Sequence, residues 1–462
     1  PVSALSLSTS QMVLLSGSED GTLRMWDLNT QEQIGEHQMP GPVLGVEAFS
    51  SNGEHVVSYS SHGLHVWQVQ YLYLVHCLLG TNVRDIRVSG GLSPSRALCV
   101  CADSAVRLIS ATTGDLLSTL LLDRGDRLLA ADYCMHRETV CVLLEDGDLV
   151  KANALVNPMS IISRVRVSTS QALPCCLTLV SCIVDVEAAI GDWKRVVHQR
   201  GDHGPHGKDH SSRVMKNRFF PVVGLDDGTL CVCDWYSSQP LCQTAAHSPG
   251  SVSSVISDWK NNLIISAGWD LTVKVWRFFP YSEESLSLSM SIYCSQRVGM
   301  MCVYRSKLFV AFQDSPTATF SLVQYCLQSG TRSDHPPGDD HQDQITGLCS
   351  CPKLRLVATC GRDRRVRIWN EENRLLRTLC LHCIPESLAF SSDRGELLVG
   401  LSNHIFRISL GKLLPLPYQL KAICMKSPST VTDPPVPVLE TEILSLSKDD
   451  RKRLTQPHSM LP

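Results

Sequence analysis

Short runs of apolar residues alternate with Gly-, Asp-, Asn- and Ser-rich stretches along most of the chain. Examples are MVLL at 12–15, TLRMW at 22–26, NLIIS at 262–266 and TVKVW at 272–276. Runs of this length, rich in β-branched residues and bounded by turn formers, are typical of β-strands, whereas helical repeats show a 3.6-residue periodicity. We therefore predict an all-β protein built from many short strands.

One pattern recurs at a fixed spacing. Three segments align without gaps: SGSEDGTLRMWD at 16–27, SAGWDLTVKVWR at 266–277 and TCGRDRRVRIWN at 359–370. Weaker copies fill the intervals, and the equivalent turn positions are Asp20, Ser61, Asp103, Asp146, Asp227, Asp270, Asp314, Asp363 and Asn403. Apart from one interval of 81 residues, the spacing averages about 43 residues, which is typical of a four-stranded propeller blade.

These units resemble the repeats of the WD-repeat (WD40) family over roughly residues 1–410. The resemblance implies a β-propeller of four-stranded antiparallel blades, in which His, Ser or Thr, Asp and Trp form a buried tetrad. Two units carry all four residues and a third carries three: His247, Ser266, Asp270 and Trp276; His341, Thr359, Asp363 and Trp369; and Ser16, Asp20 and Trp26. We interpret these residues as structural and not as a hydrolase triad, because a buried Asp is stabilised by a neighbouring imidazole and hydroxyl.

The number of units leaves two architectures open. About nine units is more than the four to eight blades with which propellers usually close. Either the chain forms one seven- or eight-bladed ring with irregular units, or it contains parts of two propellers, with residues 1–70 completing an upstream one. We expect propeller structure over 1–411, with an insertion at about 184–217, and a Pro-rich, mostly disordered tail over 412–462. The chain begins at Pro1 without Met, and we expect it to be part of a longer protein.

Composition narrows the functional class. The 462 residues are 43% hydrophobic and 19% charged with a net charge of −3, which indicates a globular chain and gives no support to nucleic-acid binding. No segment approaches 18 consecutive apolar residues, so no integral membrane contact is expected. Twenty cysteines, several in pairs at 99/101, 231/233 and 349/351, occur without a secretory leader. They predict reduced, buried thiols in a cytoplasmic protein.

The sequence contains few candidate catalytic or metal-binding residues. The insertion contains GDHGPHGKDHSS, in which His203, His206 and His210 are weak metal-ligand candidates, and no cysteines flank them at zinc-finger spacing. The motifs of nucleotide-binding proteins, serine hydrolases and zinc proteases are absent. We therefore expect no cofactor, no metal and no catalysis. The alternative is a propeller enzyme that uses a metal bound near this insertion.

The sequence thus predicts a non-catalytic scaffold that presents its rims to other proteins or peptides. The partner-binding candidates are Arg362, Arg364, Arg365, Trp269 and Asp314, chosen because they lie on the face that carries the Asp turns. The diverged units and cysteine-rich blades also resemble the large WD-repeat proteins of cilia and flagella, of the type numbered 87 and 97. That resemblance implies a place in the ciliary or flagellar axoneme, and it leaves the partner unidentified.

Overall fold

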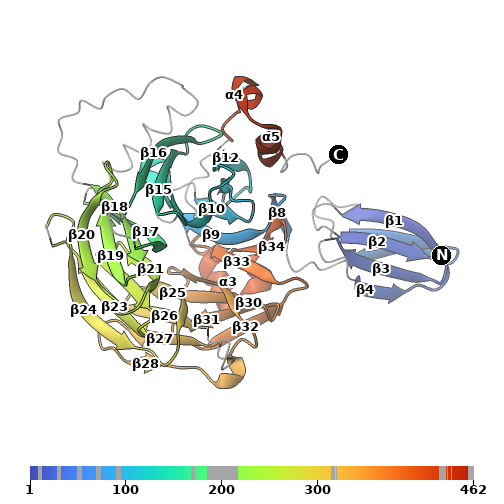
Figure 1. Ribbon diagram of the computed structural model, residues 1–462. Coiled ribbons are helices and arrows are strands. Elements are labelled where there is room, and N and C mark those ends of the chain that lie inside the picture. Colours follow the sequence, from blue (N-terminus) through green and yellow to red (C-terminus); the bar gives the residue numbers. More distant parts are fainter. Residues whose placement is uncertain are drawn as a thin grey trace.

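A computed structural model of the chain shows nine antiparallel sheets and a few short helices (Figure 1). The structure describes residues 1–8, 13–28, 33–48, 55–68, 74–89, 95–167, 172–184, 217–282, 284–313, 318, 320–425, 433, 435–438 and 440–455. Within these residues, eight sheets have four strands and one has three. The all-β class and the nine repeat units predicted from the sequence are confirmed.

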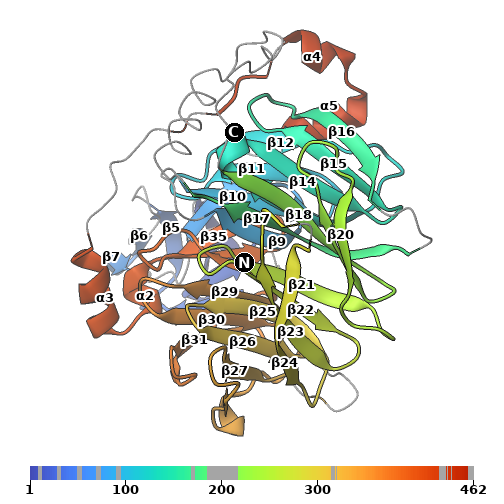
Figure 2. The same ribbon diagram turned by 90° about the vertical axis from the view of Figure 1, so that its left-hand side faces the viewer.

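Seven consecutive sheets form a closed ring over residues 74–408 (Figures 1 and 2). Their strands are β8 (Leu74–Leu78), β9 (Val83–Ser89), β10 (Arg96–Cys101), β11 (Val106–Ser110), β12 (Leu116–Leu120), β13 (Leu128–Cys134), β14 (Thr139–Leu144), β15 (Asp148–Asn153), β16 (Ser160–Arg166), β17 (Pro174–Cys182), β18 (Arg218–Leu225), β19 (Thr229–Cys233), β20 (Pro240–Ala245), β21 (Val252–Asp258), β22 (Leu263–Gly268), β23 (Thr272–Phe278), β24 (Leu286–Tyr293), β25 (Val298–Tyr304), β26 (Lys307–Phe312), β27 (Leu322–Cys326), β28 (Arg332–Ser333), β29 (Ile345–Cys351), β30 (Leu356–Gly361), β31 (Arg365–Asn370), β32 (Leu375–Cys380), β33 (Pro385–Phe390), β34 (Leu397–Leu401) and β35 (His404–Ile408). The inner strands contact one another in the order β9, β13, β17, β21, β25, β29 and β33, and β33 returns to β9.

The ring closes through its first strand. β8 pairs antiparallel with β35, with Leu78 opposite His404 and Cys77 opposite Ile405. The last sheet therefore has the order β33-β34-β35-β8, and its outer strand comes from the beginning of the ring. This pairing joins residues that are more than 300 positions apart in the sequence and ties the two ends of the ring together.

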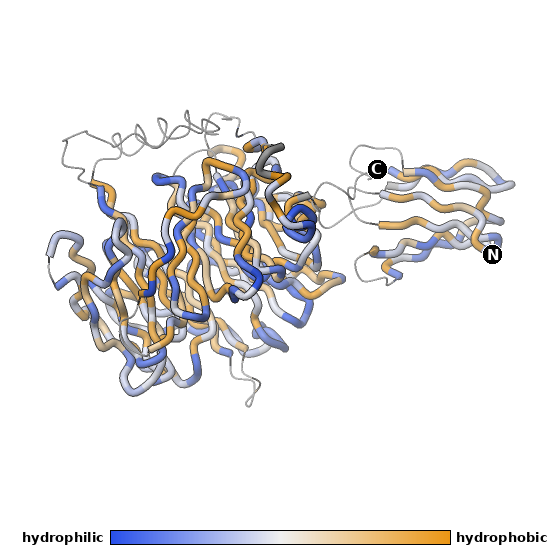
Figure 3. Tube along the Cα trace, turned by 45° about the horizontal axis from the view of Figure 1, so that its top comes forward, coloured by the Kyte–Doolittle hydropathy of each residue, from blue (hydrophilic) through white to orange (hydrophobic). Residues whose placement is uncertain are grey.

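Two further sheets lie to the side of the ring (Figures 1 and 3). Their strands are β1 (Val2–Ser8), β2 (Val13–Ser18), β3 (Thr22–Asp27) and β4 (Gln33–Gln38) in the first sheet, and β5 (Val43–Ala48), β6 (His55–Ser60) and β7 (Gly63–Gln68) in the second. β1 packs against β5. Residues 1–68 are thus not part of the ring, so the structure favours parts of two propellers over one ring that contains every unit.

The repeat pattern has a simple structural meaning. All nine turn positions fall between the second and third strands of their sheets, although Asp314 itself lies outside the described residues. Alternate residues of each strand pack against the neighbouring sheet, and Figure 3 shows the resulting hydrophobic stretches along the strands. The insertion falls between β17 and β18, and its residues 185–216, including His203, His206 and His210, are also outside the described part.

The C-terminal segment differs from the mostly disordered tail that its proline content suggested. Its described residues contain four short helices: α2 (Leu410–Leu413), α3 (Leu416–Ile423), α4 (Glu440–Ser445) and α5 (Lys448–Thr455). Leu413, Leu414 and Ala422 are buried against the sheets β29–β32 and β33–β35. The prolines that suggested disorder include Pro415 and Pro417, which lie at the N-terminus of α3, where proline is compatible with a helix.

Two 3₁₀ turns, η1 (Met135–Arg137) and η2 (Pro337–Asp339), complete the described elements. Among the helices that the structure describes, none is long and apolar enough to cross a membrane.

Candidate protein-interaction site

The tetrad of the sheet β21–β24 is a chain of hydrogen bonds that ends on the Asp turn. The Trp276 indole N–H donates to Ser266 Oγ over 3.0 Å, and the Ser266 hydroxyl lies 2.8 Å from His247 Nε2. His247 Nδ1 in turn donates to Asp270 Oδ1 over 2.9 Å. Each polar hydrogen of the chain has an acceptor, so the buried imidazole and hydroxyl are satisfied.

The sheet β29–β32 repeats this arrangement. Trp369 Nε1 donates to Thr359 Oγ1 over 2.9 Å, Thr359 Oγ1 lies 2.8 Å from His341 Nε2, and His341 Nδ1 lies 3.0 Å from Asp363 Oδ1. A buried Arg367 adds an ion pair to the same carboxylate at 2.9 Å. The structure thus brings together both predicted sets of four, and it gives them a role in holding the turns.

The two N-terminal sheets retain one hydrogen bond of the tetrad, from the Trp indole N–H to the Ser hydroxyl. Trp26 Nε1 donates to Ser16 Oγ over 2.8 Å, while the Asp20 carboxylate accepts from the Thr22 backbone N–H. Trp67 Nε1 donates to Ser58 Oγ over 2.6 Å, a bond that the sequence comparison missed because the turn of this unit is one residue shorter.

Acid should weaken the tetrads. Burial lowers the pKa of His341 below its usual 6.5, although the bond to Asp363 opposes this. Burial alone would raise the pKa of Asp363, but the bonds from His341 and Arg367 hold it below its usual range. The unfolded chain therefore binds more protons than the folded one once the pH falls below about 6.5, and stability is lost in that direction.

We expect the free energy of unfolding to decrease steadily as the pH falls from about 7 to about 4, because both groups titrate first in the unfolded chain. Urea unfolding at a series of pH values measures this. His341→Asn should make the free energy of unfolding less dependent on pH at the higher pH values of the series, since it removes the titrating imidazole. An increase in stability on acidification would contradict the assignment.

The turns above the tetrads differ in one position that governs backbone strain. The residue after the turn Asp is glycine in three sheets, where Gly21, Gly147 and Gly228 have positive φ angles. Ser104, Leu271 and Arg364 occupy the same position with φ of 60°, 59° and 57°. A non-glycine residue in this conformation costs about 1–2 kcal/mol, so these three turns are strained.

The strained Leu271 belongs to an exposed apolar and aromatic patch. Trp269 is 54% exposed, and the Arg297 guanidinium lies 3.8 Å from the centre of its ring. Tyr293, 82% exposed, pairs with Thr272 at the end of the same sheet. Trp, Tyr and Arg are the residue types that most often carry binding energy in protein interfaces. We call Trp269, Leu271, Tyr293 and Arg297 the turn-face patch.

The other sequence-based candidates lie two blades further around the same face. Arg362 and Arg364 are exposed, and Arg364 Nη1 donates to the His382 carbonyl over 3.3 Å. Arg365 is half-buried, and its backbone N–H donates to Asp363. Asp314 falls outside the described residues. Leu271, Tyr293 and Arg297 were not predicted from the sequence. Leu271 could have been, because it follows the turn residue Asp270 at a position where other units have glycine.

A central channel of about 2620 Å³ runs between the inner strands of the ring. Arg87 of β9 pairs with Asp85 at 2.9 Å, and its Nη1 lies 3.7 Å from the Asp132 carboxylate of β13. Burial raises the pKa of Asp132, but its oxygens also accept from the N–H groups of Tyr133 and Leu179 at 2.8 Å each. Asp85 and Asp132 are therefore engaged with Arg87 and with backbone donors.

In the described part of the chain, no three or more His, Cys, Asp and Glu residues are grouped so that they could hold a metal ion. All twenty cysteines are free thiols, and most are buried. In the pairs predicted to lie within blades, burial raises the pKa of Cys101 and of Cys351 to about 11 each, which keeps them protonated and unreactive. Hydrogen bonds lower the pKa of two thiols, that of Cys231 through Cys233 and that of Cys326 through Ser329.

Comparisons with known proteins agree with this geometry. The family model described as "WD domain, G-beta repeat" matches residues 1–27, 238–277 and 338–370, the three regions that contain the gap-free segments. The chain is a WD-repeat protein. It is 40% identical over 474 aligned positions to WD repeat-containing protein 97 of Homo sapiens, which covers 99% of this chain. It spans only 29% of the length of that relative, which is of the type that the sequence resembled.

Two solved structures are similar to this chain at low sequence identity. The WD40 β-propeller domain of Doa1 is 17% identical with a TM-score of 0.49, covering 74% of this chain and 98% of that one. A chain of the Mitotic Checkpoint Complex is 13% identical with the same TM-score, covering 71% of this chain and 89% of that one.

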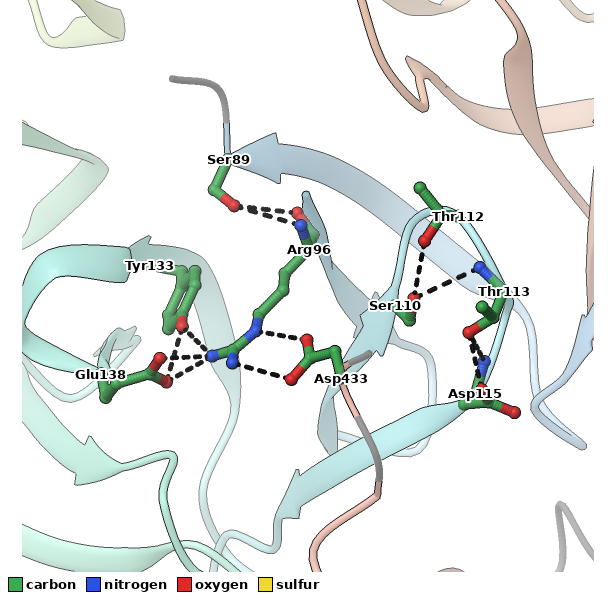
Figure 4. A network of polar contacts seen from close by, with 9 residues as sticks. All are labelled: Ser89, Arg96, Ser110, Thr112, Thr113, Asp115, Tyr133, Glu138 and Asp433. Atoms are coloured by element: carbon green, nitrogen blue, oxygen red, sulfur yellow. Dashed lines mark hydrogen bonds and ion pairs between the residues drawn. The ribbon is translucent and has the colours of Figure 1, made fainter. Parts of the chain in front are cut away.

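A second polar site in this WD-repeat chain joins the C-terminal segment to the ring (Figure 4). Arg96, at the start of β10, is fully buried and donates through Nε and Nη2 to the two carboxylate oxygens of Asp433, at 2.8 and 3.0 Å. Its Nη1 contacts the buried Glu138 carboxylate and lies 2.7 Å from the Tyr133 hydroxyl. Arg96 therefore links two neighbouring blades and the C-terminal segment.

Other contacts fix the same segment along the blade β9–β12. The backbone N–H of Val436 donates to the Leu117 carbonyl over 3.1 Å, and the Asn157 side chain donates to the Val436 carbonyl. Further along, Arg453 of α5 donates to the Asp103 carbonyl over 2.8 Å. We call residues 433–455 the strap. No sequence pattern indicated these contacts, because the residues that they join lie 279 to 350 positions apart.

Proposed function

We propose that this chain is a non-catalytic scaffold whose turn face binds a protein or peptide partner. The observation that carries the proposal is a pair of strained turns with large exposed side chains: Leu271 and Arg364, like the small Ser104, hold left-handed backbone conformations where three other blades have glycine. Strain of this kind persists when a side chain is needed at that place. Next to Leu271, the exposed Trp269 stacks with Arg297.

The chemistry of the face indicates the kind of partner. Trp269, Leu271 and Tyr293 offer apolar and aromatic surface, while Arg297, Arg362 and Arg364 offer guanidinium groups. A peptide or loop that carries both apolar side chains and carboxylates fits this combination, since Arg pairs with carboxylates in bidentate geometry. The tetrads below hold the turns rigid, which lowers the entropy lost on binding.

We also propose that the chain does not catalyse a reaction, and we propose a location for it in the cell. WD-repeat propellers in general bind other proteins, and the channel carboxylates Asp85 and Asp132 are already engaged with Arg87 and backbone donors. We place the protein in the cytoplasm and in a ciliary or axonemal assembly on the basis of its resemblance to the large ciliary WD-repeat proteins. Proximity labelling in ciliated and non-ciliated cells tests that placement.

Single substitutions on the turn face should remove partners without unfolding the protein. Trp269→Ala is expected to reduce recovery of the partner by about tenfold or more, because truncating a central aromatic residue costs about 2 kcal/mol of binding energy. Leu271→Gly should also weaken binding while leaving thermal stability equal or higher, because glycine relieves the turn strain. Quantitative affinity capture of the full-length protein from ciliated cells, with melting curves of each variant, provides both readouts.

Trp259→Ala is the matched control. Trp259 is an exposed tryptophan in the turn between β21 and β22, which lies at the opposite end of the same sheet. Its replacement should leave the captured partners unchanged. If Trp259→Ala removes the partners and Trp269→Ala keeps them, binding occurs on the opposite face and the proposal is wrong.

A further inference from the structure

The two N-terminal sheets each have one face covered and one face open. They cover each other through a small core that includes Leu15 and Leu23 of the first sheet and Val43 and Val56 of the second. In the ring, by contrast, every sheet lies between two others. The open faces can be compared, position by position, with their buried equivalents in the sheet β21–β24.

The second sheet is open on the side where the next blade would lie. Ser58 and Ser266 accept the equivalent Trp N–H bonds and thus define the register. By that register Leu64 and Val66 correspond to Val273 and Val275. Val273 and Val275 are 0% and 3% exposed because they pack against the sheet β25–β28, whereas Leu64 and Val66 are 66% and 60% exposed.

The first sheet is open on the opposite side, where the preceding blade would lie. Leu5 is opposite Ser16 in its sheet, just as Val255 is opposite Ser266. Val255 is 5% exposed and packs, with Trp276, against the preceding sheet β17–β20. Leu5 is 61% exposed, and Leu7 of the same strand is also exposed.

The second sheet also has an open edge. Among the described residues it ends at β7, and the strand that follows β7 in the chain, β8, pairs with β35 instead. In the ring, the last blade takes its outer strand from the ring's own beginning. An exposed β7 edge, with unpaired backbone groups, is a place where another strand can add.

We propose that the two N-terminal sheets are the last two blades of a second propeller, which the same polypeptide completes with a segment on the N-terminal side of residue 1. The first strand of that segment pairs with the β7 edge, its first blade covers Leu64 and Val66, and its last blade covers Leu5. Propellers close with about four to eight blades, so the segment supplies about two to six. The human relative, of which this chain spans 29%, is long enough to contain them.

A second copy of the chain is the rival occupant. It would have to cover two faces that point in opposite directions and also supply a strand to β7. The open faces carry the same kind of side chain that neighbouring blades bury within the ring, which favours a blade over an unrelated partner.

Hydrogen exchange of the full-length protein and of the 462-residue chain distinguishes these occupants. We expect the amides of β7 to exchange on the order of 100-fold more slowly in the full-length protein, because they gain hydrogen bonds there. β8, which is already paired, should be equally protected in both. Equal exchange of β7 in the two proteins would overturn the proposal. So would protection of β7 that appears in the 462-residue chain as its concentration is raised and it dimerises.

A substitution gives an independent test. Val66→Lys should leave the thermal midpoint of the 462-residue chain unchanged, because Val66 is exposed there. In the full-length protein the same substitution should lower the midpoint of one transition, because a lysine would be buried between blades. Ile162→Lys, at an exposed position on β16 of the closed ring, is the matched control and should be neutral in both. A neutral Val66→Lys in the full-length protein would contradict the proposal.

Discussion

Trp369→Ala is expected to lower the free energy of unfolding by about 3–5 kcal/mol, as for other fully buried aromatic side chains. Trp369 is 0% exposed and packs against Phe309 and Leu322 of the preceding blade. Its loss leaves a cavity between two blades and removes the N–H donor from Thr359, at the start of the bonded chain that holds Asp363. Denaturant unfolding of the purified chain measures the change, and Trp276→Ala should behave alike.

Trp26→Ala is the matched control for this prediction. Trp26 makes the same bond to Ser16, but it is only half-buried because no blade covers its face in the 462-residue chain. Its replacement should therefore have a clearly smaller effect. If Trp276→Ala and Trp369→Ala unfold at the same denaturant concentration as the wild type, the tetrads do not have the stabilising role assigned to them.

The second large effect on stability is expected at Arg96, whose buried guanidinium lies between the blades β9–β12 and β13–β16. Glu138→Gln should lower the free energy of unfolding by about 3–5 kcal/mol, because it leaves the buried Arg96 charge with Asp433 as its remaining anionic partner. Burial by itself would lower the pKa of Arg96, and the surrounding Tyr133, Glu138 and Asp433 instead raise it. Denaturant unfolding measures the loss.

The Arg96–Glu138 ion pair can be tested with a double variant. Arg96→Met combined with Glu138→Gln should be less destabilised than the sum of the two single variants, because it removes the uncompensated charge together with its partner. Asp433 can then move to solvent with the strap. Additive losses would mean that the two residues contribute through packing alone and not through their ion pair.

Asp433 has a different role from Glu138. It is held by Arg96 through two parallel bonds, and it belongs to the strap and not to a blade. The strap covers the blade β9–β12 on its way to Asp103, which is a turn position of the same face that carries the proposed binding residues. The C-terminal segment therefore stabilises one side of the binding platform as well as following it in the sequence.

The sequence was sufficient for features that depend on neighbouring residues. The spacing of Ser266, Asp270 and Trp276 identifies two strands and the turn between them, and the tetrad bonds follow from that local geometry. The alternation of apolar residues gives the strands for the same reason. The nine units, their β-propeller class and the position of the insertion between two strands were all predictable in this way.

Features that depend on distant pairing were not predictable. Whether β8 pairs with β7 or with β35 is decided by which sheet edge is free in three dimensions, and both choices look alike in the sequence. The Arg96–Asp433 pair joins residues 337 positions apart, and its aspartate lies in a proline-rich stretch that resembles a linker. Likewise, the stack of Arg297 on Trp269 needs the loop between two blades to fold back over a turn.

Closure of the ring by β8 is the central feature of the molecule, because a stable turn face requires a closed ring. Thermal unfolding of shortened chains tests it: residues 70–462 retain β8, and residues 80–462 lack it. We predict that the first fragment unfolds cooperatively at the temperature at which the ring unfolds in the 462-residue chain. The second should unfold at a much lower temperature or aggregate, because the edge of β35 is left unpaired. Equal stability of the two fragments would contradict a ring closed by β8.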